Sequence, residues 1–235
     1  MSLREIRQAL RRVGNARDAK IFQSFFKTGP GEYGEGDVFI GVRVPKIRAL
    51  VRAAGDVPLV TVRALLRSRI HEERLFALLV LVRAVQRGDE AARGRIYRLY
   101  LASTRHINNW DLVDSSAEHI VGGWLEGRSR APLRPLARSR SLWERRIAML
   151  ATFHFIRQGD PADALAIAAL LLDDEHDLIH KAVGWMLREV GKRCSVAALE
   201  SFLRKHHARM PRTMLRYAIE HFPEAKRRRY LAGTA

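Results

Sequence analysis

The chain has 235 residues, and its hydrophobic share of 47% is enough to bury a continuous core, so we expect a folded protein. Lys and Arg total 42 against 25 Asp and Glu, which leaves a formal charge of +17 and a pI near 11.1. This excess predicts a polyanionic partner, with nucleic acid the leading class. A biased nucleotide composition could enrich Arg by itself, but it would not explain why so few acidic residues balance the charge.

The single cysteine, Cys194, excludes an internal disulfide and every site that needs several cysteines to bind a metal or an iron–sulfur cluster. No segment approaches the roughly 18 consecutive apolar residues of a membrane-spanning helix. Residues Met1 to Arg12 have the pattern of a charged amphipathic helix rather than of a signal peptide. We therefore expect a cytoplasmic protein that does not enter a membrane.

The first helices are separated by Thr28 to Pro45, TGPGEYGEGDVFIGVRVP, a glycine-rich segment. A phosphate-binding loop of the type GxxxxGK[ST] needs a Lys and a hydroxyl after its last glycine, whereas Gly34 is followed by Glu35. We expect a connector that crosses the surface, although ordered loops of this length often carry function.

From about Val57 onward, apolar residues recur at helical spacing and no alternating strand pattern is present. Short polar breaks separate these blocks, near Gly55-Asp56, Ser68, Gly88-Asp89, Arg105 to Asn109, Gly127 to Ala131, Arg140, Gly159-Asp160, Asp173 to Glu175, Gly191 to Arg193 and Met210-Pro211. Tightly joined antiparallel helix pairs stack into solenoids. The sequence thus predicts a monomeric all-α protein, a single HEAT-like helical-repeat domain over residues 1–235 with a basic concave face.

The motif His71-Glu72-Glu73-Arg74-Leu75 resembles the start of a zinc-protease helix, but Leu75 stands where the second His is required. There is no GxSxG motif, and isolated histidines such as His106 and His154 are more often packing residues than catalysts. We expect no metal and no cofactor.

The segment Ile107 to Asp114, INNWDLVD, places two carboxylates at the start of a helix. Asn108 or Asn109 can cap this helix, so Asp111 falls in its first turn, where the helix dipole explains a carboxylate. Asp114 lies one turn after Trp110, beside an apolar stripe, where a carboxylate is costly unless it is paired. The alternative to a functional role is a salt bridge to an Arg of the next helix.

Two further side chains depart from the helical pattern. Arg146, in LWERR, points into an apolar stripe, and its permanent charge requires a carboxylate or a phosphate. Trp185 falls outside the core-facing stripe of its helix and is flanked by Lys181 and Arg188. An aromatic ring between cations is typical of a nucleic-acid surface, although a partly buried packing Trp explains it equally well.

The segments NNWDLVD, LWERR and KAVGWMLRE resemble the AlkD-type DNA alkylation-repair glycosylases, which are HEAT-like repeat proteins. The likeness extends to Phe25 to Pro45 and to Met210 to Glu224, so it spans nearly the whole chain. The resemblance implies that Asp114 is the catalytic carboxylate, that Trp110 and Trp185 line the lesion site, and that Arg146 lies beside them.

The resemblance further implies excision of purines alkylated at N3 or N7 from double-stranded DNA. We expect the DNA backbone to be bound by basic residues, namely Lys27, Lys181, Arg188 and Lys192. The long glycine-rich loop departs from the compact members of the family and leaves the substrate range open. The alternative is a non-catalytic HEAT-type scaffold that binds nucleic-acid structure or a partner protein, with Asp114 as a packing ion pair.

Overall fold

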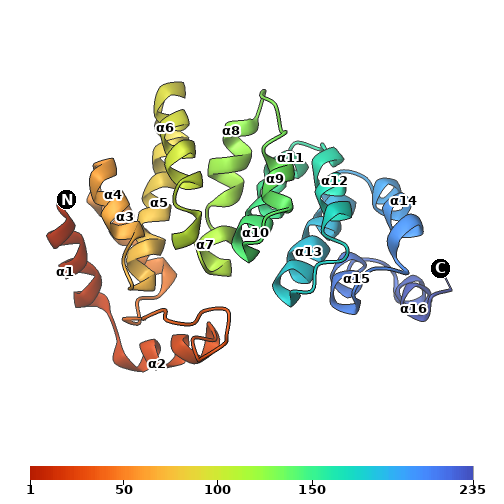
Figure 1. The fold of residues 1–235 in the computed structure, drawn as a ribbon, viewed down its shortest axis with the longest axis horizontal. Coiled ribbons are helices and arrows are strands. Elements are labelled where there is room, and N and C mark those ends of the chain that lie inside the picture. Colours follow the sequence, from red (N-terminus) through yellow and green to blue (C-terminus); the bar gives the residue numbers. More distant parts are fainter. Residues whose placement is uncertain (235) are drawn as a thin grey trace. The chain divides into compact units, whose positions relative to one another are not determined.

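The computed structural model describes residues 1–234, which form helices joined mostly by short turns, with a longer loop over residues 26–43 (Figure 1). Within these residues, β-type pairing is limited to an isolated bridge between Val38 and Ile70. The all-α prediction is confirmed. By its internal contacts the chain divides into two compact units, Met1–Ser116 and Ala117–Ala235. The single repeat domain with a basic concave face stays a prediction.

The first unit begins with α1 (Leu3–Val13), where the sequence predicts an amphipathic helix. Ser2 caps it, because the Ser2 hydroxyl accepts a hydrogen bond from the Glu5 amide while the Glu5 carboxylate accepts one from the Ser2 amide. The other elements of this unit are α2 (Ala16–Phe25), α3 (Val44–Ala54), α4 (Leu59–Leu66), α5 (His71–Arg87), α6 (Glu90–Leu101), the 3₁₀ turn η1 (Thr104–His106) and α7 (Trp110–Asp114).

Helix α5 is the centre of the first unit, because α3, α4, α6 and α7 all pack against it. Every residue from His71 to Val82 is buried, as expected for a helix surrounded by others. The first turn of α5 nevertheless carries four polar side chains, His71 to Arg74. Buried polar groups cost several kcal/mol each unless they find partners, so the surroundings of this turn must supply hydrogen bonds and opposite charges.

The second unit has a comparable centre in α13 (Asp177–Arg193), against which its neighbours pack. Ala182, Val183, Met186 and Val190 of α13 are buried, as the helical spacing predicts. The other elements are the π-helical turn η2 (Glu118–Gly122), α8 (Gly123–Leu125), α9 (Leu133–Ala137), α10 (Leu142–Ala151), α11 (Phe153–Arg157), α12 (Ala162–Leu170), α14 (Val196–His206), α15 (Arg212–Ala218) and α16 (Glu224–Ala232).

The predicted helix breaks coincide with helix ends, with one exception. The break expected at Gly191 to Arg193 is wrong, because α13 continues through Arg193. A Cβ atom on Gly191 would lie 2.6 Å from Leu199 of α14. This glycine therefore lets α14 approach α13 and does not end the helix. Within residues 1–234, no helix combines the length and the low polarity that crossing a bilayer requires.

Candidate active site

The four residues predicted to line the lesion site are divided between the two units. Trp110 and Asp114 are the first and last residues of α7 in the first unit, whereas Arg146 on α10 and Trp185 on α13 belong to the second. Their convergence on one concave surface therefore stays a prediction. Trp110 and Asp114 have neighbours in the first unit, and Arg146 and Trp185 have neighbours in the second.

Trp110 is held by a cluster of aromatic rings. It is half-buried and stacks on Phe26, with ring centroids 5.2 Å apart and an interplanar angle of 22°. The edge of Phe25 meets the indole at 5.9 Å, and Phe26 stacks in turn on Phe39 at 5.0 Å. As predicted, an Asn caps α7: Asn109 Oδ1 accepts a hydrogen bond from the Trp110 amide at 2.8 Å. The indole is thus fixed in orientation by its backbone and by its neighbours.

Asp114 lies one turn beyond Trp110 and is half-buried, while Val113 and Ala117 beside it are buried. Its negative charge reaches Tyr100, whose buried hydroxyl lies 2.9 Å from Ser116 Oγ. Burial, together with the nearby Asp114 charge, raises the pKa of Tyr100 above its ordinary value. Tyr100 is therefore a neutral neighbour of the half-buried Asp114 carboxylate.

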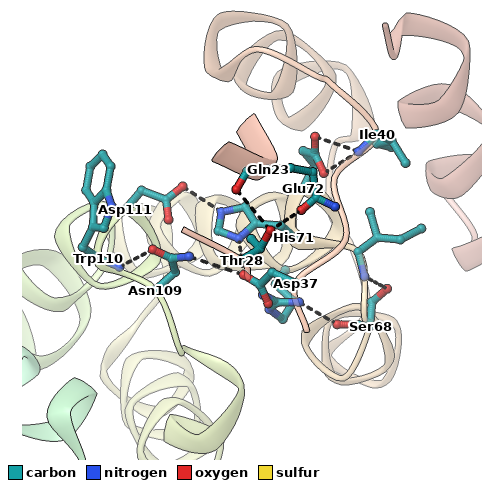
Figure 2. Close-up of polar contacts among 12 residues, drawn as sticks. Gln23, Thr28, Asp37, Ile40, Ser68, His71, Glu72, Asn109, Trp110 and Asp111 are labelled. Atoms are coloured by element: carbon teal, nitrogen blue, oxygen red, sulfur yellow. Dashed lines mark hydrogen bonds and ion pairs between the residues drawn. The ribbon is translucent and has the colours of Figure 1, made fainter. Parts of the chain in front are cut away.

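The first turn of α7 is tied to α5 by His71, in an arrangement that the sequence analysis missed. His71 Nδ1 lies 2.9 Å from Asp37 Oδ2 and His71 Nε2 lies 2.8 Å from Asp111 Oδ2 (Figure 2). Arg74 donates a hydrogen bond of 2.6 Å to Asp37 Oδ1, and Asn109 donates one of 3.4 Å to Asp37 Oδ2. We call these five residues the His71 cluster.

The charges of the His71 cluster compensate one another. Burial alone would lower the pKa of His71, but the charge of Asp111 and the hydrogen bonds to Asp111 and Asp37 raise it to about 9. Burial would raise the pKa of Asp37, but the hydrogen bond from His71 and the charge of Arg74 lower it below its ordinary value. At neutral pH, His71 is therefore an imidazolium that donates both ring N–H groups to carboxylates.

Asp111 consequently has a larger role than the one expected from sequence. It does lie in the first turn of α7, as predicted. The helix dipole is not a sufficient explanation, however, because Asp111 is also the ion-pair partner of a buried His whose side chain is 2% exposed. The signal in the sequence is the His followed by two acids in HEERL, which by its spacing resembles only an incomplete metal motif. Asp37 lies 74 residues before Asp111, so sequence spacing gives no reason to place the two side chains on the same His.

The glycine-rich loop is also more than a surface connector, and that expectation is wrong for its second half. Asp37, Phe39, Gly41 and Val42 are buried. The backbone amides of residues 40, 41 and 42 all donate hydrogen bonds to the carboxylate of Glu72, at 2.8 to 3.1 Å. Figure 2 shows those from Ile40. The loop thus supplies the donors that the buried Glu72 needs, and it packs against the same turn of α5 that holds α7.

In the second unit, Arg146 is 4% exposed and donates a hydrogen bond to the carbonyl oxygen of Leu178 on α13. The inward direction predicted for its side chain is confirmed, and it links α10 to α13. Trp185 is half-buried, and its ring lies 5.9 Å from that of Phe153 at an angle of 53°. Two guanidinium groups lie over the Phe153 ring, those of Arg157 at 4.9 Å and Arg193 at 5.5 Å.

The four predicted DNA-backbone residues differ in how available their charges are. Lys27 and Lys192 are exposed, and neither makes an ion pair within residues 1–234. Lys181 pairs with Asp177 at 2.6 Å. Arg188 is 21% exposed and is engaged by both Glu220 and Glu189. Lys27 and Lys192 are therefore the cations best placed to meet a phosphate, and Arg188 must first leave its carboxylate partners.

No group of three or more His, Cys, Asp or Glu side chains among residues 1–234 is arranged to hold a metal ion. The first unit places a half-buried carboxylate, Asp114, one turn from a stacked indole, Trp110, on a short helix whose first turn is bound to His71.

Comparison with known proteins adds independent evidence. A family model described as DNA alkylation repair enzyme matches residues 6–222. Among solved structures, a predicted DNA alkylation repair enzyme from Enterococcus faecalis is similar with a TM-score of 0.68 and 17% sequence identity, over 90% of this chain and 97% of that chain. At this identity the likeness shows the shared fold alone, and the curated proteins include no match. Since the family model covers most of the sequence, the chain belongs to the DNA alkylation repair enzyme family.

Proposed function

We propose that this protein is a DNA glycosylase that hydrolyses the N-glycosidic bond of purines alkylated at N3 or N7 in double-stranded DNA. The observation that carries the proposal is the half-buried carboxylate of Asp114, one helical turn from an indole that stacked aromatic rings hold still. We further propose that the protein acts as a monomer in the cytoplasm.

The chemistry suits a single carboxylate. Alkylation at N3 or N7 makes the purine cationic, so the base is already a good leaving group and needs little acid catalysis. The bond breaks through a sugar with oxocarbenium character, which a fixed negative charge stabilises and a positioned water then attacks. Asp114 would supply the negative charge. The buried residues Val113 and Ala117, close to it in the sequence, would lower the local dielectric and strengthen the effect of that charge.

Recognition would combine the aromatic rings with the basic residues. The face of Trp110 attracts a cationic base or packs on its deoxyribose, and stacking on Phe26 keeps the indole from rotating away. Trp185 and Arg146 would complete the lesion site from the second unit. Lys27, Lys192 and, after release of their carboxylate partners, Lys181 and Arg188 would neutralise backbone phosphates.

The decisive experiment replaces Asp114 with Asn and measures the release of methylated base from duplex DNA. The substitution keeps the size of the side chain and removes its charge, so we expect base release to fall by about 10²-fold or more. Affinity for DNA should stay nearly constant, because phosphate contacts supply most of it. Asp89→Asn is the matched control: Asp89 is exposed and caps α6, and Asn caps a helix equally well.

Two results would replace this proposal by the alternative of a non-catalytic scaffold. One is a wild-type protein that binds methylated duplex DNA and releases no base. The other is an Asp114→Asn protein that melts at a much lower temperature than the wild type while its remaining folded fraction is fully active, since Asp114 would then be a packing residue only.

A further inference from the structure

A cavity of about 510 Å³ in the first unit is open to solvent, and five of the ten residues that line it are exposed arginines. It lies between α4 and α6, and its remaining wall is the segment that leads through η1. None of the residues that line it is acidic. The basic lining residues are Arg63 from α4, Arg67 directly after it, Arg95 and Arg98 from α6, and Arg105 and His106 from η1.

None of these arginines has a carboxylate partner among the residues that the structure describes. Within residues 1–234, none of the five makes an ion pair, and Arg105 makes a side-chain hydrogen bond only to the neighbouring His106. In contrast, Arg130 is held by Asp160 and Asp163, and Arg145 by Asp174. The cavity therefore contains five guanidinium charges that no acidic side chain balances.

The helical spacing explains why these charges face one another. Arg95 and Arg98 are three residues apart in α6, so they share one face of that helix, while Arg63 lies in α4 and Arg67 directly follows it. Like charges at the spacing of Arg95 and Arg98 destabilise a helix by a few tenths of a kcal/mol. Burial lowers the pKa of His106, and the charges of Arg105 and Arg67 lower it further, as expected in a strongly positive field.

We propose that this cavity is a phosphate-binding site that takes several closely spaced phosphate groups, as in the backbone of a nucleic-acid strand or in a free oligophosphate. Guanidinium groups bind phosphate oxygens in pairs of parallel hydrogen bonds, and arginine is preferred over lysine where such recognition is needed. None of the lining residues belongs to the His71 cluster or to α7. Occupation of the cavity therefore does not depend on the glycosylase chemistry proposed for Asp114.

The size of the cavity argues for more than one phosphate. At about 30 Å³ for each water molecule, its volume equals roughly 17 waters, which exceeds the space of a single phosphate ion. A second cavity of about 600 Å³ continues from the first, since Leu59 and Arg95 line both, and it adds Arg83 and Arg87 to the basic wall along with Asp56. An extended ligand can follow this path.

The test compares two variants that lose the same charge. Arg63→Gln/Arg98→Gln removes one cation from each helical wall of the cavity, whereas Arg4→Gln/Arg12→Gln removes two exposed cations of α1 in the same unit. Binding of sodium tripolyphosphate and of a short single-stranded oligothymidylate is measured by calorimetry at matched ionic strength. Melting temperatures check the fold, and Arg95→Gln/Arg105→Gln is a second cavity variant if the first melts early.

We expect affinity to fall about 10-fold or more in the cavity variants, because two charge-assisted contacts are lost, and much less in the α1 variant. A loss for the oligonucleotide identifies the backbone of a nucleic-acid strand as the ligand. A loss for tripolyphosphate alone identifies a free oligophosphate. Equal losses in the cavity and α1 variants for both ligands would show only general electrostatic attraction and would overturn the proposal. The release of methylated base from DNA, which tests Asp114, is measured separately and is not needed for this result.

Discussion

The replacement of Asp111 by Asn tests the His71 cluster most directly. Asp111 Oδ2 accepts a hydrogen bond from His71 Nε2 at 2.8 Å, and the side chain of His71 is 2% exposed. The amide of Asn has no charge, so the imidazolium would keep only Asp37 as a counterion beside the competing charge of Arg74. His71 would then lose its proton at neutral pH, and the variant would forfeit the stability that the charged form contributes.

The pKa of His71 sets the size of this loss. Its folded value of about 9 exceeds the ordinary value of 6.5, so the stabilisation is complete below pH 6.5 and disappears as the pH rises through 9. At about 1.36 kcal/mol for each pH unit, the difference corresponds to about 3 kcal/mol in total and to about 2.5 kcal/mol at pH 7. We therefore expect Asp111→Asn to lower the free energy of unfolding by about 2 to 3 kcal/mol at pH 7.

Urea denaturation at pH 7 and pH 9.5 measures this effect in two ways. The wild type should lose about 2 kcal/mol between the two pH values, and Asp111→Asn should lose markedly less, because its His71 is already neutral. Asp18→Asn is the control, since Asp18 is also a first-turn carboxylate paired with a cation, Arg43, but at the surface. Equal pH dependence in the wild type and Asp111→Asn, or a loss no larger than that of the control, would refute this account of the His71 cluster.

Three further predictions follow from the geometry. Lys192→Ala should reduce the slope of log affinity for duplex DNA against log salt by up to about 1. Arg188→Ala should reduce this slope by less, because Glu220 and Glu189 already engage Arg188. A larger effect of Arg188→Ala would contradict this order. Excess chelator should leave base release unchanged, and inhibition that added metal reverses would show a metal requirement. Gly41→Ala should lower the melting temperature far more than Gly36→Ala. Both glycines have φ near +80°, but only at Gly41 would the new Cβ lie 1.9 Å from a backbone oxygen, that of Asn15.

The sequence by itself determined the helical class and most helix ends, because both depend on local chemistry. Apolar residues at helical spacing, and glycine, proline and asparagine between them, act within a few residues of where they stand. The same local reasoning predicted that Asn108 or Asn109 caps α7 and that Arg146 points inward, which the structure bears out. It failed at Gly191, where the reason for a glycine is the approach of α14 rather than a turn.

Only the tertiary structure decided which polar side chains meet. Asp37, His71 and Asp111 lie far apart in the sequence, and no motif around any of them predicts contact with the other two. Likewise, nothing local distinguishes Arg63 and Arg98, which face a shared cavity, from Arg130, which is neutralised by two carboxylates. Periodicity gives the side of a helix on which a charge lies. Which other element packs against that side determines the partner of the charged group. The partner in turn determines the protonation state of the group and whether it is available to a ligand.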